Sequence, residues 1–209
     1  MHSRSWLLAV LMTLSGVVNA LPADEPRSAC TWASEEGAEP VRGEPRCRLN
    51  RGYSLLYKYA TDLPKLHYFL WFKHESDALD ENAAAVFAYS KQLAGELERM
   101  AQQYPALRVD LQPLPEILDK ARDGMVKDQS SRFLPLVGDT GRAFERRLLL
   151  LLLTALDEET HVAKVLAEEE PNIELKKFAE SVHQQLDALY RRTESLLIRQ
   201  FFVADPAPK

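Results

Sequence analysis

From Ser76 onwards, apolar residues recur at intervals of three and four positions, which is typical of helices with one buried face. The clearest case is the stretch from Ser76 to Tyr104, where Ser76-Asp77 can cap the start and Pro105 stops the helix. Its predicted core stripe is Val86, Ser90, Leu93, Leu97 and Met100. We therefore expect a long amphipathic helix here.

Three further segments carry comparable stripes. Pro115 can open a helix at its first turn, with a weaker stripe of Ile117, Ala121, Met125 and Phe133 that Pro135 and Gly138 break. Asp139 or Thr140 can cap the next helix, which runs to about Glu170, and Pro171-Asn172 makes a turn and a new cap. The last helix has one apolar face, formed by Leu175, Val182, Leu186, Leu189, Leu196 and Phe201.

The region before Ser76 is predicted less sharply. A short helix is expected over Tyr53 to Tyr59, ended by Asp62-Leu63-Pro64. The run Tyr68 to Phe72 fits a buried strand or a buried helical turn equally, and helix is favoured because the rest of the chain is helical. Four long amphipathic segments with short connectors predict an all-α fold, an antiparallel four-helix-bundle-like domain with short extra N-terminal helices.

Six consecutive leucines, Leu148 to Leu153, cover a helix on every side. Such a segment has to be buried all round. Either it forms a central helix wrapped by the other helices, or its outer face is an oligomer contact. The pattern favours the first without excluding the second.

The first twenty residues predict a secretory signal. Arg4 is followed by an apolar run from Trp6 to Val18, and Val18-Asn19-Ala20 places small residues before a cut at Leu21. We expect a periplasmic or secreted protein with four parts: signal peptide 1–20, a flexible Pro/Glu-rich arm 21–49, a helical bundle 50–203 and a disordered tail 204–209. After signal cleavage no transmembrane segment remains, because no other run approaches the roughly 18 apolar residues that span a bilayer.

Charge and cysteine content narrow the functional classes. Without residues 1–20 the chain has a net charge of −6 with both signs interspersed, so nucleic acid is not an expected partner. The two cysteines, Cys30 and Cys47, predict a disulfide in an exported protein. Such a bond would contribute on the order of 3 kcal/mol in the chain-entropy description. The alternative is two free thiols in a flexible arm.

Two Glu-x-x-His pairs are the best candidates for chemistry, Glu158 with His161 and Glu180 with His183. Ferritin-like di-metal proteins use this spacing twice, with all ligands pointing into the bundle. Here both pairs lie beside the apolar stripes, among polar residues, and on consecutive helices. We expect a solvated face, with metal binding as the alternative.

Other candidate chemistry is weaker still. His67 and His74 would share a helix face with Trp71, which fits simple packing better than a shallow metal or haem contact. No nucleophile elbow, zinc-protease motif or phosphate-binding loop occurs. We therefore assign no catalytic, cofactor-binding or metal-ligating residue, expect no cofactor, and favour a protein that is not an enzyme.

Two stretches carry a resemblance. Arg51-Gly52-Tyr53-Ser54-Leu55-Leu56-Tyr57, and the helix from Phe144 through His161-Val162-Ala163-Lys164 to Glu168-Glu169-Glu170-Pro171, resemble exported bacterial α-helical bundle proteins of unknown function. In general architecture the chain is similar to ferritin-like domains of bacterial envelopes. The resemblance covers about residues 50–200, implies a periplasmic or secreted bundle, and transfers no active residue.

Apolar surface in excess of a bundle's needs, at Leu148–Leu153 and Tyr68–Phe72, suggests a function in binding. The leading hypothesis is an exported, non-enzymatic interaction module whose partner is another protein or a second copy of the chain. The alternative is a metal-binding ferritin-like protein that uses Glu158, His161, Glu180 and His183.

Overall fold

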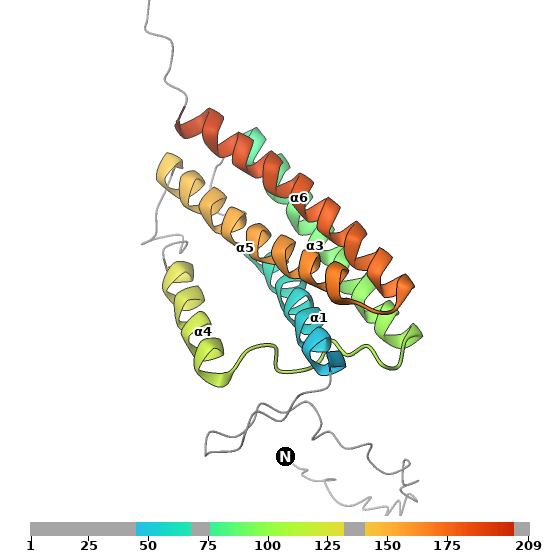
Figure 1. Ribbon diagram of the computed structural model, residues 1–209. Coiled ribbons are helices and arrows are strands. Elements are labelled where there is room, and N and C mark those ends of the chain that lie inside the picture. Colours follow the sequence, from blue (N-terminus) through green and yellow to red (C-terminus); the bar gives the residue numbers. More distant parts are fainter. Residues whose placement is uncertain (1–44, 68–75, 132–140, 203–209) are drawn as a thin grey trace, which may run out of the picture.

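The computed structural model describes residues 45–67, 76–131 and 141–202, and these are helical apart from the connections (Figure 1). The helices are α1 (Pro45–Asp62), the 3₁₀ helix η2 (Leu63–Leu66), α3 (Asp77–Gln103), α4 (Glu116–Ser131), α5 (Gly141–Glu169) and α6 (Ile173–Phe201). No strand occurs in the described ranges. The expectation of an all-α, bundle-like fold is confirmed.

The predicted limits of α3 and the predicted start of α6 are confirmed. Ser76 is the extended N-cap residue of α3, although its hydroxyl makes no capping hydrogen bond, and Tyr104 ends the helix. The Asn172 side chain accepts from the backbone N–H groups of Glu174 and Leu175 at 3.0 and 3.1 Å, which fixes the start of α6. At α5 the proposed caps Asp139 and Thr140 lie outside the described residues, and the helix begins at Gly141.

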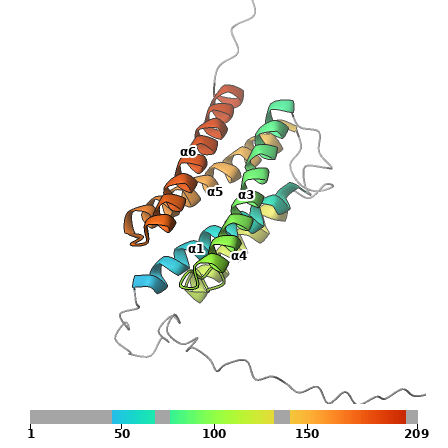
Figure 2. The same cartoon turned by 90° about the vertical axis from the view of Figure 1, so that its right-hand side faces the viewer.

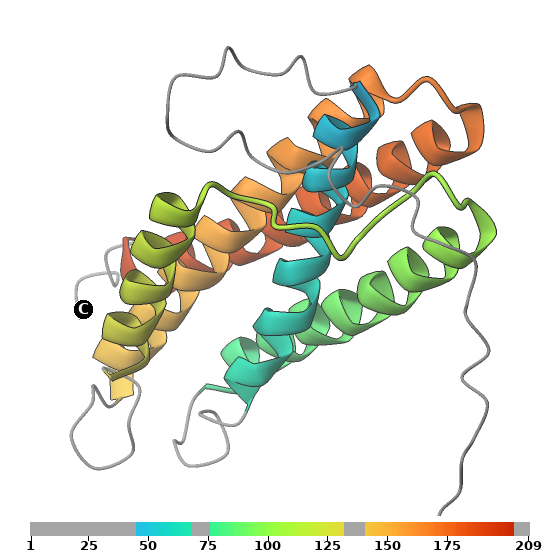
Figure 3. The ribbon, with the colours of Figure 1, turned by 90° about the horizontal axis from the view of Figure 1, so that it is seen from below.

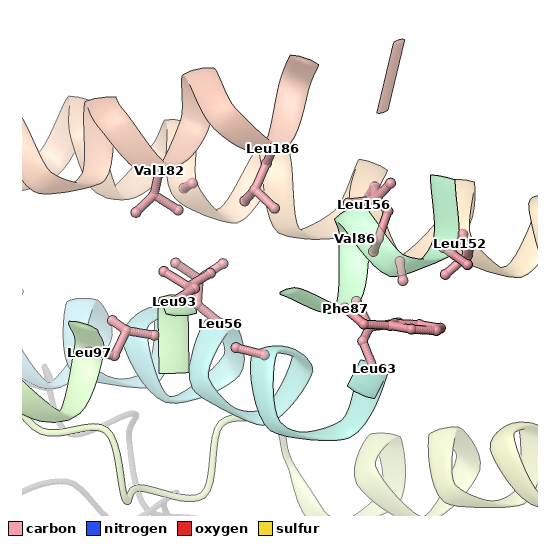
Figure 4. Packing of buried hydrophobic residues seen from close by; sticks show 14 of the residues in the cluster. Leu56, Leu63, Val86, Phe87, Leu93, Leu97, Leu152, Leu156, Val182 and Leu186 are labelled. Carbon is pink, nitrogen blue, oxygen red and sulfur yellow. The ribbon is translucent and has the colours of Figure 1, made fainter. Parts of the chain in front are cut away.

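The core lies between α1, α3, α5 and α6. The last two form a hairpin joined by residues 170–172, and α1 and α3 close its open side (Figures 1 and 2). Leucine and valine side chains from all four helices point into the space between them, with Phe87 and Leu63 at one end (Figure 4). Burial of this stripe from each helix is what holds the fold together.

The N-terminal helix is longer and more important than the pattern predicted. We expected a short helix over Tyr53–Tyr59 after an arm that reached residue 49, whereas α1 begins at Pro45. Its buried side chains are Cys47, Leu49, Asn50, Tyr53, Ser54, Leu56 and Ala60. It packs closely on α5, because a Cβ at Gly52 would lie 3.0 Å from Cδ2 of Leu166. α1 is thus the fourth core helix.

The helix that we expected in that place, α4, lies at the edge of the molecule, beside α5 (Figures 1 and 3). None of the side chains described on α4 is buried, and its predicted stripe residues Ile117, Ala121 and Met125 are exposed. Phe133 lies outside the described residues. The prediction that this stripe faces the core is wrong.

The leucine run is buried on one side rather than all round. Leu148, Leu149 and Leu152 are core residues, and Leu151 and Leu153 pack half-buried against the core. Leu150, by contrast, keeps 49% of its surface exposed. Within the described part of the chain α5 is therefore an ordinary amphipathic helix and not one wrapped on every side. An oligomer contact on its outer face remains a prediction.

Several predicted features fall on residues that the structure does not describe: the signal peptide 1–20, Cys30, the aromatic run Tyr68–Phe72 with Trp71 and His74, and the tail 204–209. In the described ranges no helix has the length and apolar character needed to cross a membrane.

Candidate functional site

The two Glu-x-x-His pairs do not converge on a common point. The Glu158 carboxylate forms an ion pair with Arg122 of α4, and the exposed His161 bonds within its own helix, with Nδ1 2.8 Å from the carbonyl oxygen of Asp157. Glu180 is exposed on α6, and Nδ1 of the half-buried His183 lies 3.2 Å from the carbonyl oxygen of Thr160. His183 therefore links α6 to α5 instead of facing a metal.

The described residues contain no group of three or more His, Cys, Asp or Glu side chains that could hold a metal ion. The other predicted candidate, His67, is exposed and meets the Phe87 ring edge-on, with 6.3 Å between ring centroids. Its proposed companions lie outside the described ranges. Neither histidine arrangement builds a site among the residues described.

Between Glu158 and His161 lies a residue that the sequence analysis passed over. Glu159 is completely buried, and neither carboxylate oxygen has a hydrogen-bond partner among the described residues. Burial, and then the charge of Glu158, raise the pKa of Glu159 to about 8. Glu159 is therefore the most perturbed acid of the described core.

A second buried acid, Glu170, has the opposite environment. Nη1 of Arg46 donates to both of its carboxylate oxygens, at 2.8 and 3.0 Å, and the Tyr53 hydroxyl donates to one of them at 3.1 Å. The backbone N–H of Asn172 also donates to this carboxylate at 3.1 Å. Burial and the adjacent Glu170 charge together raise the pKa of the Tyr53 hydroxyl. This cluster links the start of α1 to the α5–α6 turn, so its role is structural. We call these contacts among Arg46, Tyr53, Glu170 and Asn172 the structural tie.

Beside this tie the surface has a shallow open groove of about 370 Å³, lined by Pro45, Arg46, Arg48, Leu49, Glu169 and Pro171. Three charged side chains line it: Arg48 and Glu169 form an exposed ion pair at 3.1 Å, and Arg46 pairs with Glu170. Each of these charges therefore already has a partner within the protein.

A further candidate is the exposed surface of α4. Two of its charged side chains contact the bundle: Asp119 accepts from Nζ of Lys58 on α1 at 2.7 Å, and Arg122 pairs with Glu158 on α5. The Arg122 guanidinium also lies over the Tyr59 ring, 4.4 Å from its centroid. The apolar side chains Ile117, Leu118 and Met125 are 73%, 55% and 60% exposed. α4 is thus attached through Asp119 and Arg122, and its exposed surface carries three large apolar side chains.

Sequence patterning located the α4 stripe but gave it the wrong direction, and it missed Glu159. The available signal for Glu159 was its register, because Leu152, Leu156, Glu159 and Ala163 follow the core spacing of α5. An acidic residue in line with a core stripe indicates a buried carboxyl group. The Glu-x-x-His motif had instead pointed to its neighbours Glu158 and His161.

Comparisons of the chain with protein-family models, with curated proteins and with solved structures found no match.

Proposed function

We propose that this chain is an exported, non-enzymatic interaction module, and that the outward face of α4 is its binding surface. The observation that carries the proposal is the reversed orientation of α4. An amphipathic helix on a globular protein normally turns its apolar stripe to the core, whereas α4 contacts the bundle through the charged side chains of Asp119 and Arg122. Its apolar residues Ile117, Leu118 and Met125 are left exposed. Grouped exposed apolar side chains are typical of protein-binding surfaces.

The partner that this surface fits is a second copy of the chain. Ala121 lies at the centre of the stripe, with Ile117 four residues before it and Met125 four residues after it. If two α4 helices pack antiparallel about a two-fold axis at Ala121, each Ile117 lies opposite the other copy's Met125. The small alanines meet at the axis and allow close approach. A two-fold interface requires this self-complementarity.

Export is part of the same proposal, and it is supported by the order of charge, apolar run and small residues in positions 1–20. In an oxidising compartment a Cys30–Cys47 disulfide would form. Cys47 is buried near the start of α1, so that bond would fasten the preceding chain to the first core helix. Mass spectrometry of the protein from a secreting host tests the cleavage, with a mature chain that begins at Leu21 expected.

The binding proposal is tested by sedimentation velocity of the mature chain over a range of concentrations. We expect a monomer–dimer equilibrium that Ile117→Glu and Met125→Glu shift to monomer. The matched control is Val165→Glu, at a residue on α5 that is 50% exposed, and it should leave the equilibrium unchanged. Circular dichroism confirms that each variant is folded.

A wild-type chain that stays monomeric at its solubility limit would overturn self-association through α4. A dimer that survives both α4 substitutions would place the interface elsewhere, and the α4 proposal would then be wrong. Loss of the dimer in the Val165→Glu control as well would contradict a local role for α4.

A further inference from the structure

From the placement of Glu159 we infer that the core of this bundle is pH-sensitive: α5 packs fully against its neighbours only while this carboxyl group is protonated, and its ionisation loosens the bundle. The inference does not depend on the binding surface proposed for α4, because it rests on a different side chain in the interior.

The burial of Glu159 and its lack of hydrogen-bond partners strongly disfavour the charged form of its carboxyl group in the folded structure. Its exposed fraction is 0%, it lies in register with Leu156 and Ala163 on the core face of α5, and both of its oxygens lack hydrogen-bond partners in the described ranges. Glu170, equally buried, is satisfied by an arginine, a tyrosine and a backbone N–H. An unpaired carboxylate inside a protein is strongly unfavourable, so the group stays neutral or the structure opens.

Among the residues that the structure describes, the titratable groups around Glu159 give it no compensating positive charge. Glu158, on the same helix, adds negative charge, although its own carboxylate pairs with Arg122 over the Tyr59 ring of α1. On α3, burial, and then the charges of Glu96 and Glu159, raise the pKa of the Tyr89 hydroxyl. On α6, the His183 Nδ1 atom lies against the Thr160 carbonyl oxygen.

The sign of the effect follows from linkage. In the unfolded chain Glu159 has an ordinary carboxyl pKa, whereas in the folded chain its pKa is raised to about 8. The folded state therefore holds one more proton between these two values, and its stability falls as the pH rises through this window. Below the ordinary carboxyl pKa, the stability that the protonated Glu159 contributes to the folded state is fully present. Above about pH 8 this stability is lost.

The test compares urea unfolding of the wild-type chain and of Glu159→Gln between pH 5 and pH 8. Glutamine has nearly the same shape and cannot ionise, so the variant removes only the titration. We expect the wild-type unfolding constant to rise by up to about tenfold per pH unit relative to that of the variant. The matched control Glu180→Gln, at an exposed position on the neighbouring helix, should follow the wild type.

Parallel pH profiles for wild type and Glu159→Gln would overturn the inference. If the variant does not fold, the carbon-13 resonance of the Glu159 carboxyl group can be titrated in the wild-type protein instead. A midpoint well above the usual carboxyl range supports the inference, and one within that range contradicts it.

Discussion

Arg46 and Glu170 are separated by 124 positions in the sequence, and Nη1 of Arg46 lies 2.8 Å from one carboxylate oxygen of Glu170 and 3.0 Å from the other. The Glu170 side chain is fully buried, and Tyr53 donates to it as well. This contact fastens the first turn of α1 to the turn between α5 and α6. It therefore closes the core at one end of the bundle.

Replacing Glu170 should be costly. Glu170→Ala leaves the Tyr53 hydroxyl and a partly buried Arg46 without their acceptor, so we expect the free energy of unfolding to fall by about 2–4 kcal/mol. Glu169→Ala is the control, because the Glu169–Arg48 pair is exposed and should be worth less than about 1 kcal/mol. Urea unfolding of both variants measures the difference, and equal losses would contradict the structural tie.

The leucine run should show graded sensitivity to truncation. Leu149 is completely buried and Leu150 is half-exposed, so Leu149→Ala should cost about 2–5 kcal/mol of unfolding free energy. Leu150→Ala should cost less than about 1 kcal/mol. Thermal and urea unfolding check this. A large loss at Leu150 would show that its outer face is covered, as the oligomer interpretation of the run requires.

The attachment of α4 should depend on its charges. Lys58→Met removes the partner of Asp119 on the side that faces the bundle, so amide hydrogen exchange within α4 should become about 2–5 times faster, as expected for a contact worth up to about 1 kcal/mol. Amides of α5 should keep their protection. Lys65→Met serves as the control, because Lys65 forms an exposed ion pair with Asp62, three residues before it. Unchanged exchange in α4 after Lys58→Met would show that apolar contacts hold this helix.

The proposed disulfide predicts that the purified, unreduced and fully unfolded protein has no titratable thiol. Reduction should lower the free energy of unfolding by on the order of 3 kcal/mol. A double variant, Cys30→Ser with Cys47→Ala, should unfold at the same urea concentration with and without reductant. Two reactive thiols in the unreduced wild type would rule the bond out.

Helix ends were the most predictable part of this fold. Pro105, Pro115 and Asn172 act through local backbone chemistry, so the limits of α3, the start of α4 and the start of α6 follow from a few neighbouring residues. α1 was underestimated because Arg46, Arg48 and Arg51 interrupt its apolar positions and hide a stripe that begins at Cys47.

The direction in which an apolar stripe faces was harder to predict than the spacing of its residues. A stripe shows which side chains share a face, but the packing of the whole chain decides whether that face is covered. α4 carries both charged and apolar side chains, and Lys58 and Glu158 on its neighbours pair with two of the charged ones, Asp119 and Arg122. Glu159 is the opposite case. Acidic residues are usually exposed, but its position in the stripe of α5 places this one in the core.

The position of α1 in the core has a consequence for the order of assembly. A ribosome makes α1 first among the core helices, yet the surfaces that cover it belong partly to α3 and partly to α5 and the turn that follows. Until α5 and this turn have been made, the apolar side of α1 is only partly covered. Long-range closure of this kind slows folding relative to helical proteins with local contacts. The native cover of α1 is therefore complete only after residue 170 has been synthesised, 124 positions beyond Arg46.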